Sequence, residues 1–384
     1  MKTTVPSEDQ FSPGPGSLYM ALELGEKKWK LGFTVGLGQR ARMRTIEGSD
    51  VKRLLQEIER ARQRFGLSEA VPVVSCYEAG REGFWVHRFL TQQGIENWVV
   101  DSSSIEVNRK ARRVKSDRLD AAKLAEMLVR YCWGETRVWK TVHVPSGGDE
   151  DDRHLHRSLK RFKQERTARG NCIRGLLKIE GVTLRGSLEQ WQESDLESWR
   201  NWQGKPLREG LRGRLARELR QLERIREEIQ QMEAQRRQLL REKEGPKLDQ
   251  IRQLESLKGI GINASWTLVM ELFGWRQFEN RRQVGACLGL TPSGYQSGDS
   301  YREQGISKEG NRWCRDVVVE VAWLWLQWQP ESELSQWFQQ RFAGAGKRAR
   351  KVGIVALARR LSIQLWRFLQ WGEIPPGAVF YSRL

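Results

Sequence analysis

Short apolar runs separated by turn residues open the chain and predict the strands of a sheet. Residues 18–24 and 29–35 lie on either side of a Gly-Glu-Lys-Lys turn and predict an antiparallel hairpin. Residues 42–46 can add a third strand. Residues 50–65 then repeat apolar side chains at helical spacing, which predicts an amphipathic helix.

Two later apolar runs predict buried strands at residues 71–76 and 97–101, with a helix at residues 83–90 between them. A further helix is predicted to begin after Ser116, a favourable N-cap, and to continue through residue 128. The expected order is β-β-β-α-β-α-β-α. This order indicates a mixed α/β sheet led by a hairpin.

The middle of the chain is predicted to be helical. Residues 147–152, rich in Gly and acids, are interpreted as a linker, and residues 153–178 as an Arg-rich helix. Residues 211–239 repeat apolar side chains at heptad spacing, interrupted by Glu218 and Arg236, which predicts a long helix paired with another helix. The partner could be residues 153–178 of the same chain or a second copy, and the pattern leaves both open.

The last third begins with two predicted helices, at residues 254–273, joined by the turn Gly259-Ile260-Gly261. This is a helix-hairpin-helix pattern, in which turn amides and a helix N-terminus can hold a phosphate. A pair of glycines can also serve only to let two helices pack closely. Both interpretations remain open from the pattern alone.

The remaining predicted elements are a short helix, a loop and two long helices. The short helix at residues 284–290 leads into a loop of small and hydroxyl residues at positions 291–300. The helix at residues 313–328 is apolar almost all round and is expected to be buried. A basic, then apolar helix at residues 347–371 closes the chain.

The charge of the chain indicates a polyanionic partner. Its 384 residues include 66 Lys and Arg against 48 Asp and Glu, a formal net charge of +18. Basic residues spread over all segments favour nucleic acid as the partner. Backbone contacts are expected from the basic run at residues 109–115 and from the helix after Arg153, although each could be only a solvated face.

Cysteine and histidine usage argues against a zinc site and a disulfide framework. The five cysteines lie far apart without a C-x-x-C pair, and the four histidines offer only His154-x-His156. This usage fits a reducing compartment. Because no apolar run approaches the roughly 18 residues that a membrane-spanning helix needs, we expect a soluble cytoplasmic protein.

Acidic residues on predicted sheet elements point to a metal site. Glu23 lies inside an apolar strand, and the strand at residues 71–76 runs into Tyr77 and Glu78. Asp117 and Asp120 share one face of a helical first turn. Carboxylate oxygens suit Mg²⁺, and two such ions can stabilise both the attacking and the leaving oxygen of a phosphodiester. An acid at a helix N-terminus can also simply stabilise that helix. The element order and acid placement together resemble the ribonuclease H-like superfamily.

Spaced motifs in order make the resemblance more specific. The chain resembles the bridge-RNA-guided DEDD insertion-sequence transposases from about Leu18 to about Trp371. The segments that match are Val-Ser-Cys-Tyr-Glu-Ala-Gly at 74–80, Lys-Ser-Asp-Arg-Leu-Asp-Ala at 115–121, Gly-Ile-Gly at 259–261, Leu-Gly-Leu-Thr-Pro at 288–292, Gln-Ser-Gly at 296–298 and Gly-Ile-Ser-Lys-Glu-Gly-Asn-Arg at 305–312.

The resemblance implies a multidomain α/β plus α architecture. It implies a RuvC-like domain with an RNase H fold at residues 1–150, a helical linker and coiled coil at 151–250, and a mainly helical transposase domain with a helix-hairpin-helix at 251–384. It further implies dimers, then tetramers on donor and target DNA duplexes. A structured bridge RNA would pair with both DNAs, and the protein would be nucleoid-associated when bound to DNA.

The resemblance also implies residue roles. Glu23, Glu78, Asp117 and Asp120 match the acids that hold Mg²⁺ or Mn²⁺, and Ser297 matches the nucleophilic serine. Glu23 departs from the family pattern, in which Asp is usual. The residues expected to contact nucleic acid are Arg109, Lys110, Arg112, Arg113, Lys115, Lys258, Gly259, Gly261, Arg302, Lys308 and Arg312.

Two other functions fit the residues alone. A metal-dependent nuclease of the junction-resolving kind would use the four acids to activate water, and Ser297 would be structural. A non-catalytic RNA or DNA scaffold would use only the charge and the helices. The serine route needs cations near the developing phosphate charge, which Arg302, Lys308 and Arg312 could supply.

Overall fold

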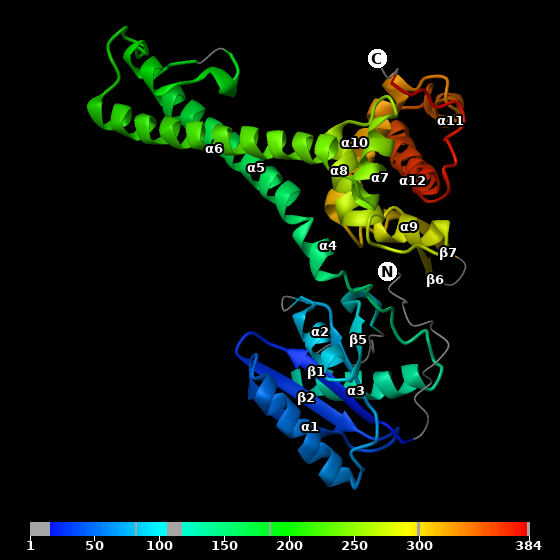
Figure 1. Ribbon diagram of the computed structural model, residues 1–384. Helices are drawn as coiled ribbons and strands as arrows, with labels where there is room; N and C mark the ends of the chain where they lie inside the picture. The colour runs from blue at the N-terminus through cyan, green and yellow to red at the C-terminus, as the bar shows by residue number, and fades with distance from the viewer. Residues whose placement is uncertain (1–15, 81–82, 106–116, 184–185, 298–299, 382–384) are drawn as a thin grey trace. The chain divides into compact units, whose positions relative to one another are not determined.

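The computed structural model describes residues 16–80, 83–105, 117–183, 186–297 and 300–381. The chain divides into two compact units, Met1–Pro145 and Ser146–Leu384. We call them the N-terminal and C-terminal units. Figure 1 shows a sheet flanked by helices in the first and an almost wholly helical second.

The N-terminal unit is built on a five-stranded mixed sheet. Strands β1 (Leu18–Leu24), β2 (Lys28–Thr34) and β3 (Arg42–Glu47) form an antiparallel meander. Strands β4 (Val73–Glu78) and β5 (Glu96–Val100) run parallel to β1, which gives the order β3-β2-β1-β4-β5. The hairpin-led mixed sheet predicted from the sequence is therefore confirmed.

Helices cover both faces of this sheet. Helices α1 (Val51–Phe65) and α2 (Trp85–Gln92) pack on one face, and α3 (Asp117–Cys132) packs on the other. Side chains of β1 alternate between these faces, as strand geometry requires, so Leu22 joins the α1 side and Ala21 the α3 side. The predicted β-β-β-α-β-α-β-α order holds, with one extra 3₁₀ turn, Ser102–Ser104, between β5 and α3.

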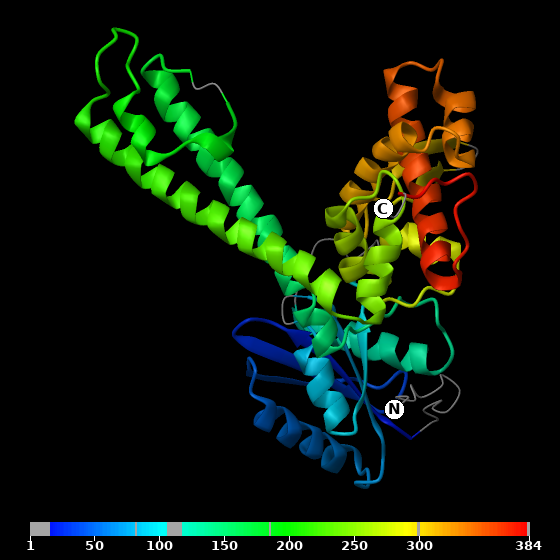
Figure 2. The same cartoon turned by 45° about the horizontal axis from the view of Figure 1, so that its top comes forward.

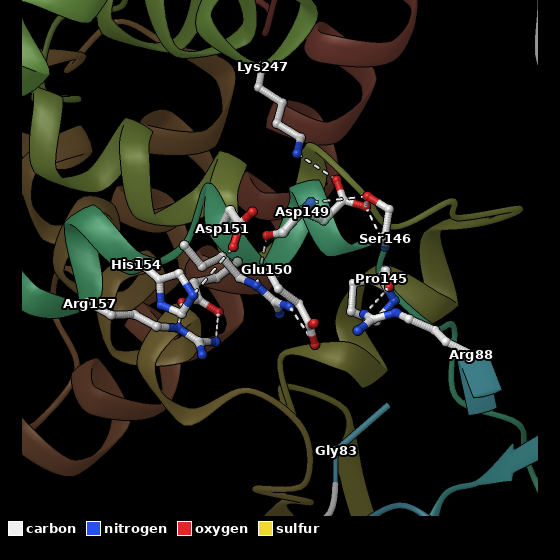
Figure 3. Close-up of polar contacts among 12 residues, drawn as sticks. Gly83, Arg88, Pro145, Ser146, Asp149, Glu150, Asp151, His154, Arg157 and Lys247 are labelled. Atoms are coloured by element: carbon white, nitrogen blue, oxygen red, sulfur yellow. Dashed lines mark hydrogen bonds and ion pairs between the residues drawn. The ribbon is translucent and has the colours of Figure 1, made fainter. Parts of the chain in front are cut away.

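The predicted linker at residues 147–152 is wrong, because this stretch forms helix α4 (Gly147–Asp151). Ser146 caps the helix by accepting from the Asp149 backbone amide, and the Asp149 carboxylate accepts from the Ser146 amide in return. Lys247 donates to Asp149 over 2.6 Å (Figure 3). Acids in the first turn and a reciprocal cap stabilise a helix that composition alone suggested would be irregular.

The predicted heptad helix pairs within the chain. Helix α5 (His154–Ile179) runs antiparallel to α6 (Glu209–Glu242), and Figure 2 shows the two side by side. Leu159 packs against Ile229 near one end of the pair, and Leu177 packs in a cluster with Leu215 near the other. The residues between the helices form a cap over the far end of the pair, where Trp191 and Trp199 are buried and Trp202 is exposed.

The helices after α6 form one hydrophobic core. They are α7 (Pro246–Glu255), α8 (Ile262–Leu268), the π-helical turn η5 (Val269–Phe273), α9 (Arg281–Cys287), α10 (Arg312–Trp328), α11 (Glu333–Phe342) and α12 (Lys347–Trp371). The closing helix α12 has the predicted bounds, whereas α11 was not predicted. The expected full burial of α10 is wrong, because Trp323 is 43% exposed and Trp328 is 50% exposed. No helix in the described ranges is both long and apolar enough to cross a membrane.

The loop predicted at residues 291–300 is also wrong. It contains β6 (Pro292–Ser297) and the first residue of β7 (Ser300–Ile306), which pair as a separate antiparallel ribbon. The stretch lacks a clear alternation of apolar and polar residues, and its small and hydroxyl residues are typical of a loop. The two strands form because their backbones pair with each other.

Candidate active site and nucleic-acid interface

Glu23 and Glu78 lie side by side at one edge of the five-stranded sheet. Strands β1 and β4 are parallel with Leu22 opposite Tyr77, so Glu23 and Glu78 are the next register positions on each strand. Paired strands lie about 4.8 Å apart, and partners in register point to the same face. Both residues follow the alternation of the α3 face; Glu23 is partly buried and Glu78 is exposed. The carboxyl ends of parallel strands are where open α/β sheets bind ligands.

The start of α3 lies against the strand next to β1. Gly32 of β2 is paired with Ala21, and a Cβ at Gly32 would be only 3.0 Å from the Ala121 carbonyl oxygen. Farther along α3, the Cys76 thiol of β4 donates to the Leu124 carbonyl over 3.9 Å. The missing side chain at Gly32 therefore lets α3 approach the sheet closely. The backbone of Asp120 directly precedes this contact.

The acids predicted as metal ligands are only partly described. Asp117 and Asp120 lie in α3, as predicted, but their side chains lie outside the described residues, as does Ser116 altogether. In the described part of the chain, no group of three or more His, Cys, Asp or Glu side chains could hold a metal ion. The described residues thus bring together Glu23 and Glu78, and oxygen donors of this kind fit Mg²⁺ or Mn²⁺.

Ser297 is the last residue of β6, opposite Ser300 at the start of β7. Its side chain lies outside the described residues, as do those of Ser293 and Arg302. The base of this hairpin is held by backbone hydrogen bonds: Ser307 donates to Thr291 over 2.9 Å and Lys308 donates to Gly289 over 3.1 Å. We call the hairpin of β6 and β7 the serine ribbon. Ser297 therefore lies at its far end, and its base is anchored to the helical core.

Two glycines, in the matched segments 288–292 and 305–312, allow close backbone packing at the base of this hairpin. Gly289 has φ +62°, and a Cβ there would collide with the Glu309 carbonyl oxygen. Gly310 has φ +81°, and a Cβ there would collide with the Cys287 carbonyl oxygen. Both positions need glycine for conformation and for space. The segment after β7 is thereby pressed onto the end of α9.

Two predicted cations follow this base. Lys308 is exposed and has a positive φ of +59°, and Arg312, the first residue of α10, has a side chain 86% exposed. The α10 N-cap is Asn311, whose side chain accepts from the Cys314 amide. The five basic residues expected at 109–115 lie outside the described residues.

The glycine turn at 259–261 supports one of its two interpretations directly. Gly259 has φ +89° and faces α10, where a Cβ would be 3.3 Å from both the Leu324 carbonyl and the Trp328 Cβ. Close helix packing therefore explains Gly259. Gly261 has open space around it, and the neighbouring Lys258 is partly buried with its carbonyl accepting from Gln329. Phosphate binding by this turn stays a prediction.

The sequence matches a transposase family in the same region. The profile of the transposase IS116/IS110/IS902 family matches residues 251–336, from α7 through the serine ribbon into α11. The chain is also 36% identical over 382 residues to y4rJ of Sinorhizobium fredii, which carries a provisional name as a transposase; the alignment covers 95% of this chain and 94% of that protein. The chain belongs to the IS116/IS110/IS902 transposase family.

Two more distant relatives have related names. A Pseudomonas aeruginosa protein provisionally named a family 20 transposase is 27% identical over 321 residues, covering 82% of this chain and 89% of that protein. The transposase for insertion sequence element IS1111A of Coxiella burnetii is 26% identical over 297 residues, covering 76% and 75%.

A buried charged cluster in this transposase-family chain was not predicted from the sequence. Glu271, on the π-helical turn, accepts from Arg157 Nε over 2.6 Å and shares a 2.9 Å hydrogen bond with His156 Nε2. Burial would raise the pKa of Glu271, but the hydrogen bonds from Arg157 and His156 lower it to about 2. Burial also lowers the pKa of His156. The only sign of this cluster in the sequence is the single acid, Glu271, within the apolar run at residues 268–273.

Proposed function

We propose that this chain is an RNA-guided insertion-sequence transposase that cuts and rejoins DNA through Ser297, with divalent metal held by four acids. Family membership over nearly the whole chain supports the DNA-transposing activity. The observation that best supports the metal site is the adjacent register of Glu23 and Glu78 at the sheet edge. The hairpin-led mixed sheet is also the arrangement expected of an RNase H-like, RuvC-like domain.

In this proposal, Glu23, Glu78, Asp117 and Asp120 would hold Mg²⁺ or Mn²⁺. The bound metal would supply stabilisation of negative charge on phosphodiester oxygens. The side chain of Glu23 is one methylene longer than the Asp usual in the resembling family, and it reaches the same edge from an ordinary strand position. Carboxylates at neighbouring positions also repel each other, so a cation between them lowers the energy of the site.

Ser297 would be the nucleophile. Its oxygen forms a bond to phosphorus and loses its proton to a base, while the bond from phosphorus to the 3′ oxygen breaks and that oxygen takes up a proton. The products are a phosphoserine ester and a free 3′-hydroxyl. Attack by the 3′-hydroxyl of another strand reverses the step, restores the serine and needs no ATP. Arg302, Lys308 and Arg312 would neutralise the non-bridging oxygens.

Target choice would belong to the RNA. A bridge RNA that pairs with donor and target DNA would supply sequence specificity, and the protein would bind backbones. The net charge of +18 supports this division, because phosphate contacts dominate non-specific affinity. Dimers and tetramers on two duplexes complete the proposal.

The decisive experiment is a denaturing-gel search for a covalent protein–DNA adduct. The wild-type protein is incubated with DNA spanning the joined ends of the element, Mg²⁺ and RNA copurified from cells carrying the element. We expect an adduct that is absent from Ser297→Ala and Asp117→Asn and present in the matched variant Ser293→Ala. An adduct that persists in Ser297→Ala would assign the nucleophile to another residue.

A water-activating nuclease is the second candidate, since the paired acids alone could serve it. In that case Ser297→Ala would still cleave DNA and no adduct would form. Loss of cleavage only in Glu78→Gln and Asp117→Asn would then replace the serine mechanism by metal-dependent hydrolysis.

A further inference from the structure

A cleft opens within the C-terminal unit between helix α5 and helices α8 and α10. Its volume is about 870 Å³. The α5 wall is entirely polar apart from Leu159 and Ala168. Its polar side chains are His156, Lys160, Lys163, Gln164, Thr167 and Asn171. The opposite wall is largely apolar and includes Ile262, Val317, Val321 and Leu324 beside Asn263, Trp313 and one acid, Glu320. A space of this size fits a few linked nucleotides and excludes a duplex.

Lys160 places a positive charge on the wall of this cleft. Its Nζ lies 3.8 Å from the centre of the Trp313 ring, and no carboxylate of a described residue is within ion-pair distance of it. Lys163, by contrast, is paired with Glu233 over 2.6 Å. Burial lowers the pKa of Lys160, Asp316 opposes that shift, and Arg312 adds to it. Lys160 is thus a partly desolvated cation that lies over an aromatic ring and is repelled by Arg312, an arrangement that a bound anion would stabilise.

A second cation lies buried among the residues that line the cleft. Arg236 is only 2% exposed, and its guanidinium donates to the Asn263 side chain and to the Ile262 carbonyl, both over 2.8 Å. Its Nε has no hydrogen-bond partner among the described residues. Burial lowers the pKa of Arg236 to about 10, which leaves it protonated at neutral pH. Glu233 and Glu255 partly offset this effect of burial, and the guanidinium lies 4.7 Å from the centre of the Trp266 ring.

The cleft continues toward the serine ribbon. A neighbouring hollow of about 390 Å³ shares Lys160, Gln164 and Trp313 with it and extends to Arg157 and Asn311. Asn311 donates its backbone amide to Cys287 at the base of the ribbon, and Arg312 follows directly. The described residues therefore form a basic and amide-rich path along α5 that leads to the segment after β7.

We propose that this cleft binds a single-stranded segment of nucleic acid, with phosphates beside Lys160 and over Arg236 and bases against the amide side chains. The proposal rests on the proposed function and deepens it by assigning a strand of the bound nucleic acid to a defined surface. The shared chemistry is a phosphodiester chain with unpaired bases, which either RNA or displaced DNA could supply. The α5 wall of the cleft carries the amide side chains of Gln164 and Asn171, which can hydrogen-bond to unpaired bases.

Fluorescence anisotropy of labelled oligonucleotides tests the proposal. Single-stranded RNA, single-stranded DNA and duplex DNA of about 12 nucleotides, within the range of single-strand sites, are titrated with full-length protein. We expect Lys160→Glu to weaken single-strand binding about tenfold and to lower the salt slope by about one, as loss of a phosphate contact does. The matched control is Lys205→Glu, the same charge reversal at an exposed position of the C-terminal unit outside α5 and the cleft.

A second variant separates charge from shape. Asn171→Trp fills the cleft without changing charge, so we expect weaker single-strand binding with an unchanged salt slope. Thermal melting of each variant, together with the milder Lys160→Gln, identifies any loss that comes from unfolding. The RNA and DNA arms identify which strand the cleft prefers.

Equal effects of Lys160→Glu and Lys205→Glu would overturn the cleft assignment while leaving the proposed function intact. Unchanged oligonucleotide binding with an altered oligomeric state in Asn171→Trp would overturn it too, because the cleft would then be a protein interface. A wild-type protein that binds neither single strands nor duplexes would overturn the proposed function itself.

Discussion

Glu23 and Glu78 occupy neighbouring register positions at the carboxyl ends of two parallel strands, on the sheet face covered by α3. Their separation in the sequence is large, and only the pairing of β1 with β4 brings them together. The start of α3 approaches β2, the strand paired with β1, where the Ala121 carbonyl lies against Gly32. Metal binding at this edge can be tested without DNA.

We predict that Mg²⁺ or Mn²⁺ raises the melting temperature of the wild-type protein and has a smaller effect on Glu23→Gln and Glu78→Gln. A ligand that binds only the folded state stabilises it by mass action. The control is Glu47→Gln, an exposed acid at the end of β3. Equal metal-induced shifts in all four proteins would remove these two glutamates from the metal site.

Gly32→Val should destabilise the N-terminal unit by about 1–3 kcal/mol, the usual cost of overpacking. The new side chain would meet the Ala121 carbonyl and the Met43 sulfur, so α3 must move off the sheet. Denaturant unfolding measures the loss. The comparison variant is Gly36→Ala, where a Cβ meets nothing within 4 Å. Similar midpoints for both variants would contradict the close helix–sheet contact.

Gly289→Ala should disturb the serine ribbon. The substitution combines a left-handed backbone with a collision against the Glu309 carbonyl, so we expect a loss of at least about 2 kcal/mol and a large fall in adduct formation. Gly344→Ala, at an open position, is the matched control. Retained adduct formation in Gly289→Ala would show that the base of the ribbon tolerates displacement.

Glu271→Gln should destabilise the C-terminal unit by about 3 kcal/mol, because it removes the charge partner of Arg157 and one acceptor of the buried cluster. The variant Glu165→Gln, which removes an exposed acid paired with Arg161, should change stability by less than about 1 kcal/mol. Urea denaturation of both variants measures the difference. Equal effects would mean that the buried cluster contributes no more than a surface pair.

The same cluster predicts acid sensitivity. The folded pKa of Glu271 is about 2, below its ordinary value of 4.5, so its contribution is complete above pH 4.5 and is lost as the pH falls toward 2. That shift corresponds to about 3 kcal/mol. His156 also makes the folded state less stable as the pH falls, beginning near its ordinary pKa of 6.5. Burial lowers the pKa of His156 in the folded state, so protonation favours the unfolded state. In Glu271→Gln, the loss of stability between pH 4.5 and 2 should be smaller than in wild type.

Local patterns predicted regular elements well where apolar side chains are buried. The apolar run of β1 and the heptads of α6 depend only on which side chains need to leave water. Composition gave the wrong secondary structure where capping or strand pairing stabilises the element. Residues 147–151 form a helix because Ser146 and Asp149 cap each other, and residues 292–297 form a strand because β7 pairs with them.

The sequence by itself determined the sheet elements, their order, the helical character of the second half, the net charge and the resemblance to a transposase family. These properties follow from side-chain periodicity, composition and motifs, which are local. Only the tertiary structure decided that Glu23 adjoins Glu78, that α5 is the partner of α6, and that Lys160 and Arg236 line one cleft. Such relationships depend on packing between residues far apart in the chain, and no local pattern encodes which distant surfaces meet.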